Sequence, residues 1–197
     1  RGGERRPRPS AWRACRRAVA TACRRRLVGQ MGVPPDAGGP GYVDGGSRVG
    51  ELPRVHAGRL ALEKAVAVAA VEPDALILAA DTVVAVGRRI LPKVEDEATL
   101  RICMALLSGR RHRVMTGVAL ALPEGGMRSR LVETMIAIKR LSAQEIDFYA
   151  SRGEWRGKAG GYALQGYGEV YVRHLAGSYS NVVGLPLSET MALLAGE

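Results

Sequence analysis

The chain has 197 residues, enough for one domain or two small lobes, and 47% of them are hydrophobic, which allows a sizeable core. No stretch approaches the roughly 18 uninterrupted apolar residues of a membrane helix, and the Arg-rich N-terminus lacks the apolar segment of a secretory signal, so no membrane partner is expected. The formal net charge is +10.

The positive charge is concentrated at the N-terminus. Residues 1–30 hold ten Arg and one Glu, so they carry nearly all of the excess. A nucleic-acid surface would need basic residues spread over a folded face with aromatic residues between them, and aromatics make up only 5% of the chain. We therefore expect no nucleic-acid partner. The three cysteines and three histidines lack metal-ligand spacing, which favours a reducing, cytoplasmic setting.

The first half of the chain predicts a loop, a helix and two strands. Residues 1–49 are basic and rich in Gly and Pro, and we expect them to be poorly ordered. Order is expected to begin near Leu52, with a helix that ends before Pro73. A buried strand follows over 75–80. Residues 81–91 continue as strand, turn and strand around Gly87.

The second half predicts alternating helices and strands. A helix is expected over 95–109, with acids in its first turn, where the helix dipole favours them. Strands over 111–122 and 128–141 are joined by a hairpin at 123–126. Ser142 and Glu145 form a capping box for a helix over 143–151. A strand lies within 168–179, and Ser188 is expected to cap the last helix, 189–196. The mixture indicates an α/β fold with a mixed sheet.

One charged residue interrupts the apolar strands. "LILAADTVVAV" places Asp81 between two segments that both read as buried, and a carboxylate there costs several kcal/mol unless something pairs with it. The partner could be a basic residue, a metal ion, a polarised water or a substrate. We interpret Asp81 and Thr82 as lying at a strand end.

Three further segments carry polar residues that suit phosphate chemistry. Glu63 and Lys64 are adjacent on the first predicted helix, where a surface pair is the plainer interpretation, and Lys93 follows the strand "RRIL". "GKAGGYALQGYG" (157–168) holds five Gly and Gln165, and Gly-rich loops let the backbone approach phosphates. Two lysines could neutralise a polyphosphate, and Asp81 could bind Mg²⁺ or Mn²⁺ or accept a proton from water.

The ordered motifs resemble the Maf family of nucleoside triphosphate pyrophosphatases. They are "RLALEKA", "ADTVV", "ILPK", "LSGRRHRVMTGVAL", "LSAQEIDFY", "KAGGYALQGYG" and "GSYSNVVGLPL", from about Gly50 to the C-terminus. The segment "KAGGYALQG" is similar to the branch of the family that hydrolyses dTTP and UTP. We therefore expect residues 50–197 to form a Maf-like pyrophosphatase domain.

The resemblance implies a fold, a reaction and a set of site residues. The implied fold is α/β with an elongated mixed sheet flanked by helices and two lobes around a nucleotide cleft. The implied reaction cleaves a nucleoside triphosphate to the monophosphate and pyrophosphate with a divalent metal, Mg²⁺ or Mn²⁺, in a protein whose relatives pair as homodimers. Asp81 matches the proton acceptor and, with Glu63, the metal site; the positions that match substrate-binding and specificity residues are Thr82, Gln165, Arg24, Lys64 and Lys93.

The N-terminal part departs from the family pattern. The family has an apolar strand and then "SxSPRR", which here becomes "AVATACRRR". Without gaps, Cys23 and Arg24 stand at the two arginines, and a shift of one residue would place Arg24 and Arg25 there. The acid that follows Asp44 in the family is replaced by Gly45. These losses keep open an alternative, a non-catalytic Maf-like protein that binds nucleotide or regulates cell division.

Overall fold

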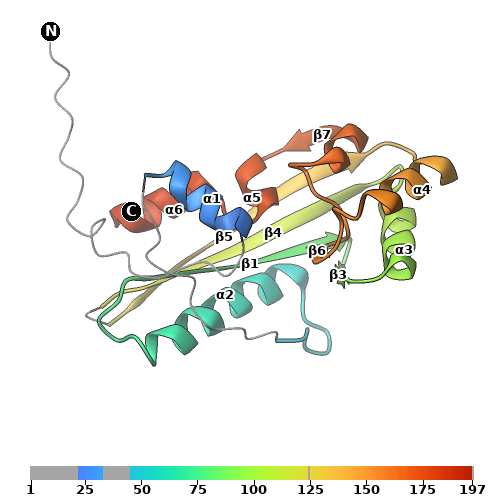
Figure 1. The fold of residues 1–197 in the computed structure, drawn as a ribbon. Coiled ribbons are helices and arrows are strands. Elements are labelled where there is room, and N and C mark those ends of the chain that lie inside the picture. The colour runs from blue at the N-terminus through green and yellow to red at the C-terminus, as the bar shows by residue number, and fades with distance from the viewer. Residues whose placement is uncertain (1–21, 33–44, 124, 197) are drawn as a thin grey trace, which may run out of the picture.

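The computed structural model describes residues 22–32, 45–123 and 125–196. An elongated antiparallel sheet of five strands, in the order β2-β1-β4-β5-β7, runs the length of the molecule (Figure 1). Its strands are β1 (Ile77–Val86), β2 (Arg89–Leu91), β4 (Arg111–Ala121), β5 (Met127–Ile138) and β7 (Val172–Ala176), and a separate two-stranded sheet pairs β3 (Lys93–Val94) with β6 (Lys158–Ala159).

The helices flank this sheet and extend beyond one end of it (Figure 1). They are α1 (Ala22–Gln30), α2 (Pro53–Ala69), α3 (Glu97–Leu107), α4 (Ala143–Arg152), α5 (Tyr179–Val183) and α6 (Leu187–Ala195), with a 3-10 helix, η2, over Tyr167–Tyr171. The expected α/β class with an elongated, helix-flanked sheet is confirmed. The sheet is antiparallel in every strand pair of the described residues, where a mixed sheet was expected: β1–β2 and β4–β5 are hairpins, and β1–β4 and β5–β7 are antiparallel across longer connections.

Helix α2 covers one face of the sheet. Its small residues, such as Ala57, Ala61 and Ala65, are buried against β1 and β4. The approach is closest at Gly117 of β4, where an added Cβ would lie 2.3 Å from the carbonyl oxygen of Ala57. Alanines on the helix and glycine on the strand therefore let the backbones meet, and this contact fixes α2 over the centre of the sheet.

Helices α1 and α6 pack on the opposite face, where Leu27 and Val28 of α1 meet Leu78 of β1 and Leu193 of α6 in a buried cluster. The expectation that order begins near Leu52 is therefore wrong for residues 22–30. Among the residues of α1 whose burial is described, only these two are buried, and three consecutive arginines precede them. So short a helix gives no sustained apolar period.

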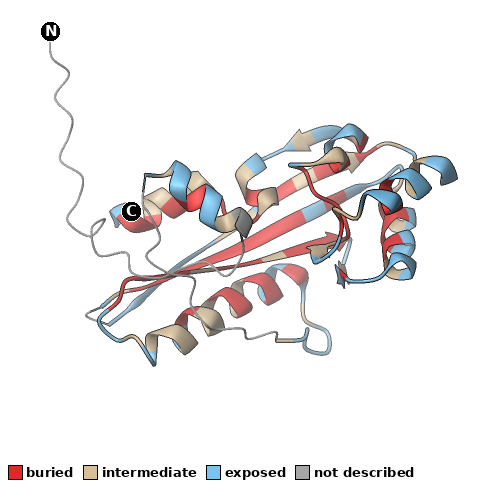
Figure 2. Ribbon diagram, viewed as in Figure 1, coloured by how far each residue is buried: buried red, intermediate tan, exposed pale blue. Residues whose placement is uncertain are grey.

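A second lobe surrounds β3 and β6 beyond one end of the long sheet. Its core includes Leu100 of α3, Tyr149 of α4 and Trp155, all buried. Figure 2 shows both buried and exposed stretches along α3. The capping box of Ser142 and Glu145 at the start of α4 is confirmed. The same core includes Val84 and Ile136 of the long sheet, so this lobe is packed on the end of the sheet, and the expected nucleotide cleft stays a prediction.

The C-terminal helix begins earlier than the sequence suggested. Its N-cap position is Pro186, so Ser188 lies inside α6 and does not cap it. The hydroxyl of Ser180 instead accepts a hydrogen bond from the Leu187 amide, 3.1 Å away. Ser180 belongs to α5, a short helix that was not predicted, and this contact supplies the acceptor that Ser188 was expected to provide.

Within the described ranges, none of the helices has the length and apolar character needed to cross a membrane.

Candidate active site

Asp81 lies in the middle of β1, not at a strand end as predicted. It pairs with Gly117 in the unbroken β1–β4 ladder, and the residue is only 8% exposed. The ammonium group of Lys64 donates a hydrogen bond to Asp81 Oδ1 over 2.5 Å. The carboxylate is therefore tolerated between apolar segments because a basic side chain pairs with it inside the fold.

Helix α2 brings Lys64 to Asp81 and turns Glu63 elsewhere. Neighbouring residues on a helix point about 100° apart, so only one of the two can face the strand. Arg59 Nη1 donates to both oxygens of Glu63, at 3.1 and 3.0 Å, and Arg48 donates to Oε1 at 3.2 Å. The described contacts of Glu63 are thus with arginines on its own side of the helix.

Thr82 points to the face opposite Asp81, because successive residues of a strand alternate. Arg24 of α1 donates from Nη2 to the Thr82 hydroxyl over 3.2 Å and from Nε to the carbonyl of Gly184 over 2.9 Å. The Thr82 hydroxyl also lies 3.0 Å from the hydroxyl of Thr116. The predicted specificity residue and the predicted phosphate-binding arginine are therefore in direct contact.

This polar network continues into the sheet through two residues that the sequence reasoning missed. Thr116 donates to the backbone carbonyl of Asn181, 3.1 Å away, and the Asn181 side chain donates to Val114 O and to the hydroxyl of Thr134. Thr116 and Asn181 are fully buried. A threonine within the apolar run "RVMTGVALAL" was the signal available in the sequence.

The remaining predicted residues lie in the second lobe. Lys93 is exposed at the start of β3, where it pairs with Ala159 of β6. Gln165 is exposed in the segment between β6 and η2. The structure thus brings together Lys64 with Asp81 and Arg24 with Thr82, while Lys93 and Gln165 stand on separate segments of the other lobe.

A buried ion-pair network orders the start of α2. The Glu51 carboxylate, 5% exposed, accepts hydrogen bonds from Arg59 Nε and Nη2, at 2.6 and 2.8 Å, and lies 2.8 Å from His56 Nδ1. Hydrogen bonds from Arg59 hold the pKa of Glu51 well below its usual range, and the carboxylate raises the pKa of Arg59 in return. The pairing of Glu51 with Arg59, eight residues further along the chain, was not predicted from the sequence.

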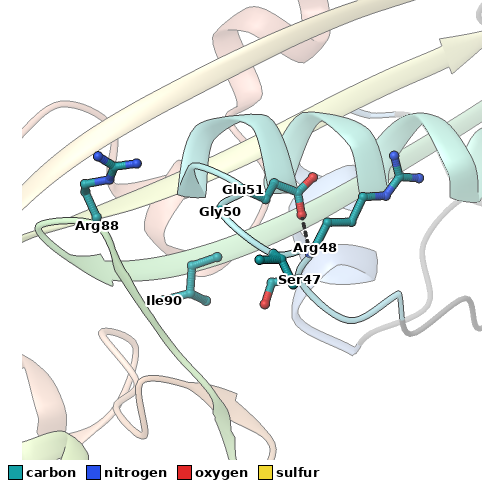
Figure 3. Close-up of a pocket in the computed structure, with 7 residues that line it drawn as sticks. Ser47, Arg48, Gly50, Glu51, Arg88 and Ile90 are labelled. Atoms are coloured by element: carbon teal, nitrogen blue, oxygen red, sulfur yellow. Dashed lines mark hydrogen bonds between the residues drawn. The ribbon is translucent and has the colours of Figure 1, made fainter.

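A pocket of about 460 Å³ opens beside this network (Figure 3). Its lining comes from the segment that precedes α2 and from the β1–β2 hairpin: Ser47, Arg48, Val49, Gly50, Glu51, Arg88 and Ile90. Within it the Arg48 amide donates to Glu51 Oε2 over 3.0 Å. None of the predicted site residues lines this pocket, so we do not place the reaction there.

The two predicted metal ligands differ in how well they suit a cation. Both oxygens of Glu63 are occupied by arginine, whereas Lys64 takes Oδ1 of Asp81. Across the described ranges, no group of three or more His, Cys, Asp or Glu is placed to hold a metal. Because Mg²⁺ commonly binds one or two carboxylates with the remaining positions filled by water and substrate phosphate, Asp81 fits such a site.

Some sequence predictions concern residues outside the described ranges. Asp44 and the first part of the altered "SxSPRR" motif, up to Thr21, belong to this group. The proposed boundary between residues 49 and 50 stays a prediction, although α1 is packed against the same sheet as the rest of the chain.

Known proteins are similar to this chain over nearly its whole length. The dTTP/UTP pyrophosphatase of Caulobacter vibrioides (strain ATCC 19089 / CIP 103742 / CB 15) is 56% identical over 180 residues, which span 90% of this chain and 93% of that protein. A protein of the same name from Paramagnetospirillum magneticum (strain ATCC 700264 / AMB-1) is also 56% identical, over 90% of this chain and 95% of that protein.

A solved structure is more distantly similar. The nucleoside-triphosphatase, or dITP/XTP pyrophosphatase, of Mycobacterium abscessus ATCC 19977 / DSM 44196 is 18% identical, with a TM-score of 0.43 over 87% of this chain and 85% of that one. The family model described as Maf-like protein matches residues 18–197. This extent of similarity, over both the sheet and the second lobe, shows that the chain belongs to the Maf family.

Proposed function

We propose that the protein is a nucleoside triphosphate pyrophosphatase that hydrolyses dTTP, UTP and related pyrimidine nucleotides to the monophosphate and pyrophosphate. Family membership and the names of the relatives support this substrate class. The observation that carries the proposal within this chain is the pairing of Asp81 with Lys64 inside the fold. A carboxylate can accept a proton from the water that attacks the phosphate, and a neighbouring ammonium group offsets the negative charge on the phosphate. The Asp81–Lys64 pair therefore supplies both groups that base-assisted hydrolysis requires.

In this proposal Asp81 accepts a proton from the attacking water. A positioned general base contributes typically 10²–10⁴-fold to a rate. The hydrogen bond from Lys64 to Oδ1 fixes the orientation of the carboxylate, which leaves the two lone pairs of Oδ2 for the water and for a cation. Lys64 also brings positive charge close to the point of attack, where negative charge develops on the phosphate oxygens.

The other predicted residues bind the nucleotide. Arg24, Lys93 and Lys64 supply positive charge for the phosphates, and Thr82 and Gln165 hydrogen-bond the base. Asp81 and Thr82 leave opposite faces of one strand, but their Cα atoms are only about 3.8 Å apart along the chain. A nucleoside triphosphate is an extended molecule, so a nucleotide that crosses the edge of β1 could contact both side chains.

A divalent cation, Mg²⁺ or Mn²⁺, completes the proposal. Asp81 would hold it together with substrate phosphate oxygens, and when bound it would offset the charge of the leaving pyrophosphate. Glu63 stays a predicted second ligand that would first have to separate from Arg59. Removal of divalent cations with EDTA should abolish turnover, and added Mg²⁺ or Mn²⁺ should restore it. Full activity in EDTA would contradict the metal requirement.

Product analysis tests the activity. Purified protein is incubated with UTP, dTTP and GTP in Mg²⁺ or Mn²⁺, and nucleotides are separated by ion-exchange chromatography. We expect UMP or dTMP with equimolar pyrophosphate, and slower turnover of GTP. Formation of diphosphate and inorganic phosphate would contradict the bond assignment. No turnover of any nucleotide would leave the non-catalytic binding or regulatory alternative. The cytoplasmic location and the homodimer also stay predictions.

A further inference from the structure

The segment that carries Gln165 is closed into a compact turn by hydrogen bonds. The amide of Gly166 donates to the carbonyl of Ala163 over 3.2 Å. The Ala163 amide in turn donates to the hydroxyl of Tyr149 over 3.1 Å, and the Gly168 amide donates to Glu154 Oε1 over 3.0 Å. Gln165 lies within this turn as its exposed residue.

The two glycines of the turn leave room for these contacts. A Cβ added at Gly166 would lie 2.8 Å from Glu154 Oε2, and one added at Gly168 would lie 2.7 Å from the carbonyl oxygen of Ala163. Both distances are shorter than a real Cβ contact, so a side chain at either position would push the carboxylate or the backbone away. The sequence "QGYG" therefore has its glycines where Glu154 and the returning chain lie closest.

Glu154 is itself held in place from the α4 side. Its side chain is only 21% exposed, and its Oε2 lies 3.5 Å from Arg152 Nε. Tyr149 is fully buried on α4, so the residue that holds the other end of the turn is fixed by the core of the second lobe. The turn is thus anchored at both ends, through Tyr149 of α4 at Ala163 and through Glu154, two residues beyond the end of α4, at Gly168.

We infer that Glu154 is a positioning residue for substrate selection, which holds the turn of residues 163–168 so that Gln165 presents its amide to the base. The inference rests on the proposed function and on the specificity role of Gln165. A glutamine on an untethered surface loop would sample many orientations, and a hydrogen bond to a base is effective only when donor and acceptor are pre-arranged. Glu154 acts through the backbone of the turn and makes no contact with substrate in this account.

The test compares Glu154→Ala with Glu154→Gln, because the glutamine can still accept from the Gly168 amide. Glu169, exposed on η2 in the same segment, gives the matched control Glu169→Ala. For each variant, kcat and KM are measured with UTP and GTP, together with Tm and the hydrogen exchange rate of the Gly168 amide. We expect Glu154→Ala to raise KM for UTP about tenfold with kcat changed less than threefold, since a lost hydrogen bond to a charged group is worth about a factor of ten or more.

The outcomes separate the inference from the proposed function. In Glu154→Ala the UTP-over-GTP preference should fall and Gly168 should exchange faster, and Glu154→Gln should restore both measurements to near wild type. An active Glu154→Ala variant with unchanged preference and unchanged exchange would overturn the inference. If the wild type hydrolyses no nucleotide, the proposed function fails and the selection role fails with it. Gly168 exchange then tests only whether Glu154 holds the turn: unchanged exchange in Glu154→Ala overturns that contact, and faster exchange supports that contact alone.

Discussion

Lys64 on helix α2 and Asp81 on strand β1 meet through a 2.5 Å hydrogen bond in the interior of the fold. Their side chains are 15% and 12% exposed. The contact depends on the close approach of α2 to the sheet, which the glycine at position 117 permits. The pair therefore links the packing of the first helix to the residue proposed to activate water.

A double-mutant cycle measures this link. Lys64→Met, Asp81→Asn and the double variant are unfolded in urea, and their free energies of unfolding are compared. Because each single variant removes one member of a largely buried pair, we expect a coupling energy of about 1–3 kcal/mol. Additive effects within about 0.5 kcal/mol would show that the two side chains do not interact in solution.

Arg24 offers a second test, of both role and alignment. Lysine cannot reproduce the two directed contacts that Arg24 makes with Thr82 and Gly184. We expect Arg24→Lys to lower kcat/KM for UTP about tenfold, as a lost charged hydrogen bond would. Arg25→Lys is the matched control, because Arg25 is exposed on the same helix. A larger loss in the Arg25 variant would contradict the assignment and favour the alignment shifted by one residue.

The Thr82 hydroxyl can be removed with little change of shape. Thr82→Val removes the hydroxyl that accepts from Arg24 and contacts Thr116, whereas Thr82→Ser keeps that hydroxyl. We expect the valine variant to lose about 1 kcal/mol of stability and to discriminate less between UTP and GTP, measured by urea unfolding and by the ratio of kcat/KM values. Equal substrate ratios in wild type, valine and serine variants would exclude Thr82 from base selection.

The sequence predicted the chemistry better than the arrangement. The strand β1, the Gly87 turn, the α4 capping box and the family were all accessible, because apolar runs, turn residues and motif order are local signals. Asp81 was assigned to a strand end, since a lone acid in an apolar run looks like a boundary. Its mid-strand position depends on Lys64, 17 residues away, and such pairing has no local signature.

The elements that sequence reasoning missed have weak local patterns. Helix α1 presents only Leu27 and Val28 to the core among its residues of described burial, and α5 is five residues long. The opposite-face placement of Asp81 and Thr82 follows from strand alternation, but it becomes visible only once α1 and α2 are known to cover different faces. The contacts of Glu51 with Arg59 and of Glu154 with the Gly168 amide join residues eight and fourteen positions apart, and they have no signature in the local sequence.

His112 predicts a pH dependence of stability. Burial beside Tyr162, whose hydroxyl lies 2.7 Å from His112 Nε2, lowers the pKa of His112 from 6.5 to about 4. His112 therefore binds a proton more tightly in the unfolded chain than in the folded protein. As the pH drops from about 6.5 to about 4, this difference lowers the free energy of unfolding. The expected loss is about 3 kcal/mol, at 1.36 kcal/mol per pKa unit.

The check on His112 is urea unfolding at several pH values for wild type and His112→Gln. Glutamine does not titrate and can still hydrogen-bond the Tyr162 hydroxyl. We expect the variant to be less stable than wild type near pH 7 but to lose less stability between pH 6.5 and 4. The same slope in both proteins would mean that His112 does not titrate in this way.

The central claim is that the Asp81 carboxylate drives hydrolysis of the triphosphate, and the turnover number of Asp81→Asn with UTP tests it most directly. The variant keeps the size of the side chain and an oxygen that can accept from Lys64, and circular dichroism is measured alongside to check that it is folded. The account predicts a kcat at least about 10²-fold below wild type, the lower end of what a general base contributes. A folded Asp81→Asn variant with kcat within threefold of wild type would contradict it.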